Sequence, residues 1–182
     1  MKLKLLIAVL ALQSAWLLGT VARQENILHV GQVVLLETQP VDPRDPLRGD
    51  FVRLNYKISN VPLKLLPDSV RMDRPYAGPV FVAVAPNGTN GFWEITRADV
   101  KKFSAAENEI LLRGTAEDLR WSPPDTLRVA YGLEQYFVAE GTGNPRGKLT
   151  VQAAVARSGQ ASIKQVFVDG QPYADAMKRQ GH

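Results

Sequence analysis

Cysteine is absent from this sequence, and histidine occurs only as His29 and His182. The lack of cysteine excludes disulfides, a thiol nucleophile and cysteine-ligated zinc or iron–sulfur centres. Two histidines so far apart in the chain do not make a histidine-rich metal site. We therefore expect no metal ion and no cofactor, and we expect packing alone to stabilise the fold.

The sequence also lacks a large excess of charge of either sign. It has 22 basic and 18 acidic residues, but Lys2 and Lys4 belong to an apolar N-terminal segment, so the rest of the chain carries 20 basic against 18 acidic residues. The two signs are interspersed. A nucleic-acid-binding domain normally concentrates basic residues on one face, so this composition argues against a nucleic-acid partner.

The N-terminus is the one long apolar stretch. Lys2 and Lys4 precede Leu5–Val21, a run of 17 residues that is interrupted only by Gln13, Ser14, Gly19 and Thr20. This length lies at the lower limit for a helix that crosses the hydrocarbon core of a bilayer. The sequence predicts a targeting segment over residues 1–22 and one folded domain over residues 23–182.

Two fates are open to this segment. Thr20-Val21-Ala22 offers small residues to a signal peptidase, and cleavage there would release a soluble exported protein. The length of the run and Trp16 favour an uncleaved anchor. Both fates give the same orientation, because two lysines precede the run and only Arg23 follows it within twenty residues. We expect a single-pass protein whose body lies outside the cytoplasm.

The body reads as mainly β. Its apolar residues fall in short β-branched and aromatic runs that turn residues separate, at intervals of about ten residues. The runs are Val33–Leu36, Phe51–Ile58, Pro79–Ala85, Phe92–Thr96, Ile110–Arg113, Thr126–Tyr131, Lys148–Arg157 and Ser162–Val168. They predict a single antiparallel β-sandwich or a partly closed β-barrel, preceded by one hydrophobic helix.

Three local features refine this expectation. The segment between Pro86 and Gly91 predicts a hairpin turn, and Gly159 supplies the positive φ that a tight connection needs. A short helix or a helical turn is expected at 97–106 and at 134–140. Within 51–58, strict alternation places Val52, Leu54, Tyr56 and Ile58 on one inward face.

The densest group of charges lies directly before that alternating run. Residues 41–50 hold two Asp-Pro steps, and their carboxylates and guanidiniums interleave. One interpretation is a loop and strand framework that these charges hold together. The other is a binding surface made by this loop, the following strand and an aromatic side chain further along the chain. Its candidate residues are Asp42, Asp45, Arg48, Gly49, Asp50, Phe51, Leu54, Tyr56 and Tyr136.

The stretch Gly49-Asp50-Phe51-Val52-Arg53-Leu54-Asn55-Tyr56 resembles the G-D-Y-x-x-L-x-Y motif of the GDYXXLXY family of bacterial membrane-anchored proteins, with Phe51 in place of tyrosine. Residues 131–143 and 161–170 resemble two further stretches of that family. The resemblance implies an N-terminal membrane segment in the bacterial inner membrane, a domain facing the periplasm or cell exterior, and a multi-pass membrane protein as partner. It implies no catalytic residues.

The sequence gives little support for a calcium site or for a serine-peptidase active site. A calcium site at Asp42, Asp45 and Asp50 would place Arg44 and Arg48 against the ion. The Gly-Asp step also resembles the start of a strand in bacterial signal peptidases, but no serine lies between Glu37 and Arg48 to act as nucleophile.

Residues 131–143 leave two interpretations open, because Tyr136 and Phe137 lie in a glycine-rich stretch. These aromatic side chains either form an exposed docking loop or pack into the core. The sequence therefore predicts a membrane-anchored accessory or interaction domain rather than an enzyme. The alternative is a periplasmic small-ligand binder or an enzyme that uses the 41–50 loop.

Overall fold

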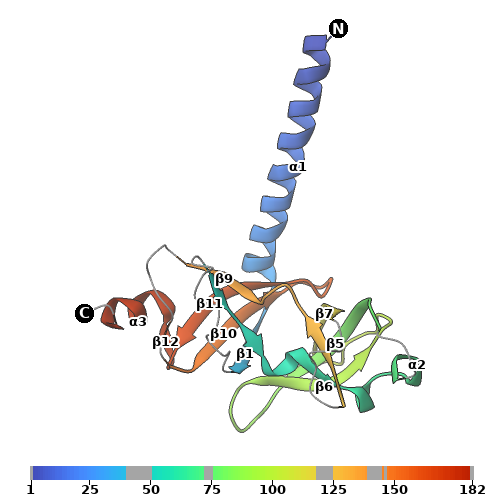
Figure 1. Ribbon diagram of the computed structural model, residues 1–182, viewed down its shortest axis with the longest axis vertical. Coiled ribbons are helices and arrows are strands. Elements are labelled where there is room, and N and C mark those ends of the chain that lie inside the picture. The colour runs from blue at the N-terminus through green and yellow to red at the C-terminus, as the bar shows by residue number, and fades with distance from the viewer. Residues whose placement is uncertain are drawn as a thin grey trace.

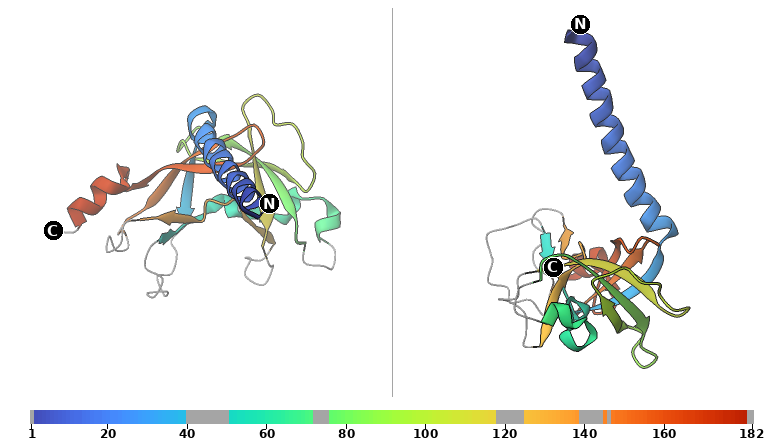
Figure 2. Two further views of the ribbon diagram at one scale, coloured as in Figure 1. Left: turned by 90° about the horizontal axis from the view of Figure 1, so that it is seen from above. Right: turned by 90° about the vertical axis from the view of Figure 1, so that its right-hand side faces the viewer.

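The structure is a computed structural model that describes residues 2–39, 51–71, 76–117, 125–138, 145 and 147–180. One long helix, α1 (Lys2–Val30), projects from a β body, and only its C-terminal end contacts that body (Figures 1 and 2). In chain order, the body contains β1 (Gln32–Gln39), β2 (Phe51–Arg53), β3 (Asn55–Tyr56), η1 (Lys57–Ser59), β4 (Asn60–Pro62), η2 (Leu63–Leu65), α2 (Asp68–Arg71), β5 (Pro79–Pro86), β6 (Trp93–Asp99), β7 (Ile110–Ala116), β8 (Thr126–Ala130), β9 (Gln135–Phe137), β10 (Leu149–Val155), β11 (Ala161–Val168), β12 (Gln171–Pro172) and α3 (Tyr173–Gln180).

Two antiparallel five-stranded sheets form the body. The first has the order β12-β11-β10-β1-β3 and the second has the order β4-β8-β7-β5-β6. The short 3₁₀ turn η1 connects β3, at the edge of the first sheet, to β4, at the edge of the second. A further pair, β2 and β9, lies beside this corner. The expected mainly β architecture is confirmed, with the sheets curved into a nearly closed barrel-like form.

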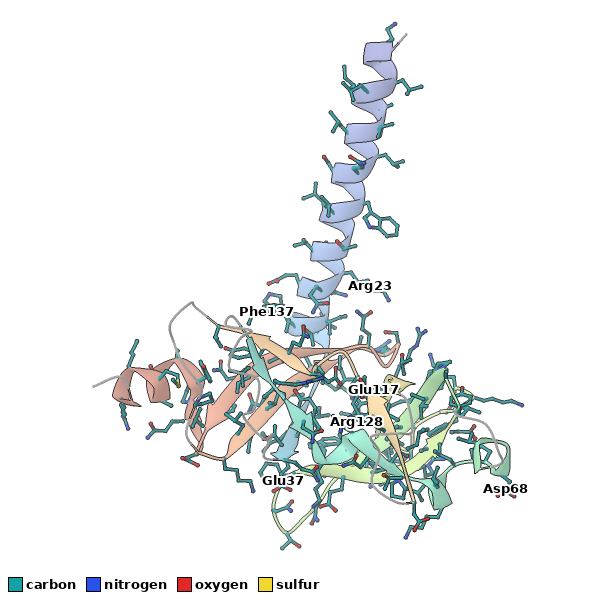
Figure 3. All side chains as sticks on the ribbon, viewed as in Figure 1. Arg23, Glu37, Asp68, Glu117, Arg128 and Phe137 are labelled. Atoms are coloured by element: carbon teal, nitrogen blue, oxygen red, sulfur yellow. The ribbon has the colours of Figure 1, made fainter. Side chains whose placement is uncertain are left out.

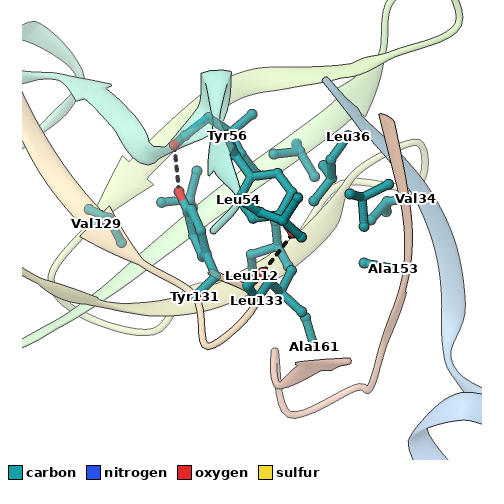
Figure 4. Packing of buried hydrophobic residues seen from close by; sticks show 14 of the residues in the cluster. Val34, Leu36, Leu54, Tyr56, Leu112, Val129, Tyr131, Leu133, Ala153 and Ala161 are labelled. Carbon is teal, nitrogen blue, oxygen red and sulfur yellow. Dashed lines mark hydrogen bonds between the residues drawn. The ribbon is translucent and has the colours of Figure 1, made fainter. Parts of the chain in front are cut away.

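The core lies between the two sheets. Val34 and Leu36 of β1 and Ala153 of β10 face Leu112 of β7 and Val129 of β8 (Figure 4). The side chains on β1, β7 and β8 alternate with exposed or half-buried neighbours along their strands, as expected of strands that bury one face. Burying them provides the main favourable free energy in a chain that contains no cysteine.

Several sequence predictions are confirmed in detail. β5 and β6 form the expected hairpin, with Pro86 opposite Trp93 and Gly91 at a φ of 72°. β10 and β11 pair around a turn in which Gly159 has a φ of 89°. All four predicted inward residues of 51–58 are buried, although this segment is two short strands and a 3₁₀ turn rather than one strand.

Neither predicted helix or helical turn is present where the structure describes these two segments. Residues 97–99 continue β6, because Arg97 and Asp99 pair with Ala83 and Phe81, and residues 100–109 form no helix. Residues 135–137 form β9, which pairs with β2. In the described part of the body the α-helices are instead the four-residue α2 and the C-terminal α3, neither of which the sequence pattern indicated.

Candidate functional site

Five of the nine candidate residues lie outside the described part of the chain. They are Asp42, Asp45, Arg48, Gly49 and Asp50. The other four are Phe51, Leu54, Tyr56 and Tyr136, and the structure places them on or beside the β2–β9 pair. The geometry of the candidate site is therefore that of this pair and its surroundings.

Two stretches that are distant in the sequence form this pair. β2 runs antiparallel to β9, so that Phe51 lies opposite Phe137, Val52 opposite Tyr136 and Arg53 opposite Gln135. Leu54 follows β2, and its backbone N–H donates to the carbonyl oxygen of Glu134 at 2.8 Å. The strand that carries the motif and the aromatic stretch at 131–138 are thus held together along their backbones.

Two buried tyrosines fasten the same stretches from the inside. The Tyr56 hydroxyl donates to the carbonyl oxygen of Leu133 at 2.8 Å, and the Tyr131 hydroxyl donates to the carbonyl oxygen of Ile58 at 2.8 Å (Figure 4). Each tyrosine therefore satisfies a backbone carbonyl on the segment that carries the other. Leaving either carbonyl unpaired in this core would be costly, so the two bonds fix how the segments dock.

Glu134 completes this arrangement. Its carboxylate accepts a hydrogen bond from the backbone N–H of Tyr131 at 2.6 Å. Burial, together with the Glu134 charge, raises the pKa of both Tyr56 and Tyr131 far above the usual range. Both phenols are therefore neutral at physiological pH and act as hydrogen-bond donors. They are not bases or nucleophiles, and this part of the motif has a structural role.

Tyr136 has a different environment. Its ring packs edge-on against Tyr173 of α3, with ring centroids 5.3 Å apart and an interplanar angle of 72°. The Tyr173 side chain is buried, and its hydroxyl has no hydrogen-bond partner among the residues the structure describes. Tyr136 thus links β9 to the C-terminal helix. No local sequence pattern indicates this contact, because α3 was not expected.

Burial differs along the aromatic stretch. Tyr131 and Leu133 are buried in the core, as the packing interpretation predicts. Phe137 is 72% exposed and lies on the side of the body from which α1 projects, as the docking interpretation predicts (Figure 3). Phe137 lies on the exposed face of β9, where alternate side chains point to opposite faces.

A surface pocket of about 280 Å³ lies apart from the motif. It is lined by Gln32, Lys102, Phe103, Ser104, Ala105, Glu109, Ile110, Leu111, Ala156 and Arg157. The Glu109 carboxylate accepts hydrogen bonds from Arg97 at 2.6 Å, from the Thr96 hydroxyl at 2.7 Å and from the Ala106 backbone at 2.9 Å. These donors, Arg97 foremost, lower the pKa of Glu109 to about 2. A carboxylate so fully engaged holds its loop in place and is a poor general base.

The described residues offer neither a metal site nor an evident catalytic group. Among them, no three His, Asp or Glu side chains come together in a way that could hold a metal ion. The acid with the largest pKa shift is Glu109, and its partners are those of a structural ion pair. The clearest functional feature of the described residues is the apolar helix α1, to which the body is attached.

That helix is exposed over most of its length. A stretch of 18 residues within Lys4–Val30 has a mean hydropathy of 2.0, and none of it is buried against the body. Leucine, isoleucine, valine and tryptophan side chains project on all sides above Arg23 (Figure 3). By length and composition this helix could cross a membrane, as an anchor or as a signal sequence.

Fold and sequence together define a mainly β domain carried on an N-terminal apolar helix. The family model described as GDYXXLXY protein matches residues 13–166, which include the C-terminal part of α1 and the body as far as β11. The chain belongs to this family. No curated protein and no solved structure matches it.

Proposed function

We propose that this chain is an uncleaved single-pass membrane protein whose β body works outside the cytoplasm as an accessory or interaction domain for an integral membrane protein. The observation that carries the proposal is the form of α1, which is one unbroken helix from the apolar segment into the body.

The apolar part of α1 fits a membrane better than water. Residues 5–21 rise about 26 Å as a helix at 1.5 Å per residue, close to the roughly 30 Å thickness of a bilayer hydrocarbon core. Large side chains here are mostly exposed, Leu12 and Trp16 each at 73%. Leaving this much apolar surface in water costs about 25 cal/mol per Å², a cost that insertion into lipid removes.

The lower part of α1 supports retention over cleavage. Ile27 is buried against the body, and the Gln24 amide donates to the Ser162 hydroxyl on β11 at 2.6 Å. Gly31 then ends the helix where a Cβ would collide with the Ile27 carbonyl oxygen and crowd Val155. Cleavage after Ala22 would require unwinding the helix immediately before its docked turns. The same contacts hold the body close to the membrane surface without a flexible linker.

The charges that flank the apolar part support an external body. Lys2 and Lys4 lie before it, and Arg23 is the only basic residue in the twenty that follow it. Basic residues remain on the cytoplasmic side of a membrane span. An anchored body also has a raised effective concentration near other proteins of the same membrane, which suits an accessory role.

Membrane fractionation with matched arginine variants tests the anchor. Leu12 lies at mid-span, where arginine costs about 2.5–3.5 kcal/mol, whereas Val30 is exposed below the span. We expect wild type and Val30→Arg to remain, at full length, in a carbonate-washed membrane pellet, and Leu12→Arg to be reduced there. A shortened, wash-soluble wild-type chain that begins near Arg23 would contradict the proposal.

A further inference from the structure

Gln13 lies at the midpoint of the apolar run 5–21, eight residues from either end. At 1.5 Å per residue this is about 12 Å from each edge of the span, farther than a glutamine side chain reaches. If α1 crosses the membrane as proposed above, the Gln13 amide lies near the bilayer centre. It brings two donors and one acceptor into a region without water.

The helix itself leaves this amide unsatisfied. Gln13 is exposed, and its side chain makes no hydrogen bond within the described part of the chain. Thr20 differs, because its hydroxyl donates to the Leu17 carbonyl oxygen at 2.7 Å in its own helix. A buried amide without a partner is costly in hydrocarbon, so a polar group from outside the chain is needed.

The direction in which Gln13 points is set by the docked end of the helix. Eleven residues separate Gln13 from Gln24, which is three turns of 3.6 residues to within about 20°. Seven residues separate Thr20 from Ile27, which is two turns to within about 20°. Gln24 and Ile27 contact the body, so Gln13 and Thr20 lie on the face of α1 above the β10–β11 hairpin.

This direction argues against a second copy of the chain as the partner. A parallel second helix packs about 8–10 Å from the first, so a copy paired through Gln13 would descend on the face that holds Gln24 and Ile27. The body of the first copy already lies there. The second copy would bring its own body to the same place, and the two bodies would collide.

We propose that the Gln13 face of α1 binds a transmembrane helix of a different protein through a hydrogen-bonding side chain near mid-membrane. The body beneath this face requires that the partner helix end close to the membrane surface, as helices joined by short loops do. This inference rests on the proposed function and adds to it the contact residue and the chemistry of the partner.

A defined probe tests the inference with the full-length chain in phosphatidylcholine vesicles. The probe is a leucine-rich transmembrane peptide of about 20 residues with one asparagine at its midpoint, and an all-leucine peptide is the reference. Because the chain lacks cysteine, Lys2→Cys accepts a single fluorophore for energy-transfer measurements. We expect binding of the asparagine peptide to be roughly 5- to 30-fold tighter than binding of the all-leucine peptide.

Gln13→Leu should reduce this ratio to about one, whereas the isosteric control Thr20→Val, on the same face, should preserve it. A wild-type ratio of one, or a ratio that Gln13→Leu leaves unchanged, would overturn the inference. Energy transfer between two copies of the chain that depends on Gln13 would overturn it as well, because the face would then belong to a second copy. Loss of the wild-type chain from carbonate-washed vesicles would overturn the proposed anchor together with this inference. Retention with a ratio of one would overturn the inference alone.

Discussion

At the scale of single residues, the described part of the family motif is explained by hydrogen bonds that it makes inside the core. Tyr56 and Tyr131 each donate to a carbonyl oxygen on the segment that carries the other, and both side chains are buried. A phenylalanine could fill either space but would leave a carbonyl without its donor. The hydrogen bond from Tyr56 therefore explains why the last motif position carries a tyrosine hydroxyl. The alternation of the sequence alone explains only why this position is buried.

Removing this hydroxyl should destabilise the body. We expect Tyr56→Phe to lower the free energy of unfolding by about 1–3 kcal/mol, because the Leu133 carbonyl then lacks its donor in the core. Urea denaturation of the detergent-solubilised full-length chain measures this change. Tyr76→Phe is the matched control, since its hydroxyl bond to the Pro79 carbonyl is exposed and its loss should cost about 0.5 kcal/mol or less. Equal effects of the two variants would contradict the structural role of Tyr56.

Glu109 makes the folded state less stable at acidic pH. Its pKa falls from 4.5 to about 2 in the folded chain, chiefly through the hydrogen bond from Arg97. The folded state therefore binds this proton less tightly than the unfolded state does. The stabilisation is complete above about pH 5 and is lost as the pH falls through 4.5 toward 2.

Melting temperatures between pH 6 and pH 2.5 test this direction. We expect Glu109→Gln to lose less stability on acidification than wild type, because its side chain has no proton to gain. Glu107→Gln, at an exposed position in the same loop, should follow the wild-type profile. If Glu109→Gln also follows that profile, the ion pair with Arg97 is not the cause of the pH dependence.

At the scale of elements, much of the fold could be predicted because strand residues and turn residues alternate clearly. Val80–Ala85 and residues 93–96 are rich in β-branched and aromatic residues and flank a Pro-Asn-Gly turn, so local chemistry and tertiary structure agree there. The helices expected at 97–106 and 134–140 were wrong where the structure describes them, because residues 97–99 pair with β5 and residues 135–137 pair with β2, and this pairing overrides a weak local preference. The contact of Tyr136 with α3 depends on tertiary structure and had no local signal.

The candidate site could be predicted only where the local sequence pattern determines burial. The burial of Leu54 and Tyr56 follows from alternation, and the structure confirms it. Their partners Glu134 and Leu133 lie nearly eighty residues away in the chain, so spacing could not identify them. The charged residues of 41–50 lie outside the described residues, and their role as a binding loop stays a prediction.

The junction between α1 and the body makes a prediction at this scale. Ile27→Ser should weaken the docking of the last helical turns, because it removes an apolar side chain that is buried against the body. We expect faster amide hydrogen exchange over residues 24–30 in this variant. Val30→Ser, at a position 75% exposed, should leave exchange unchanged. Equal exchange in wild type and Ile27→Ser would show that Ile27 does not hold the helix to the body.

At the scale of the whole molecule, the central claim is that α1 anchors the body to a membrane and that the body faces away from the cytoplasm. The unbroken helix, its exposed apolar side chains and the lysines at its start all support that arrangement. The absence of cysteine makes orientation directly measurable, because any introduced thiol is unique.

Thiol labelling of intact cells tests this claim most directly. Ser158→Cys places a thiol at the exposed turn between β10 and β11, and Lys4→Cys places one before the apolar run. We predict that a membrane-impermeant maleimide labels the Ser158→Cys chain at its full-length mass in intact cells, and labels the Lys4→Cys chain only after lysis. Labelling of the Ser158→Cys chain only after lysis, or only in a shortened chain, would contradict the account.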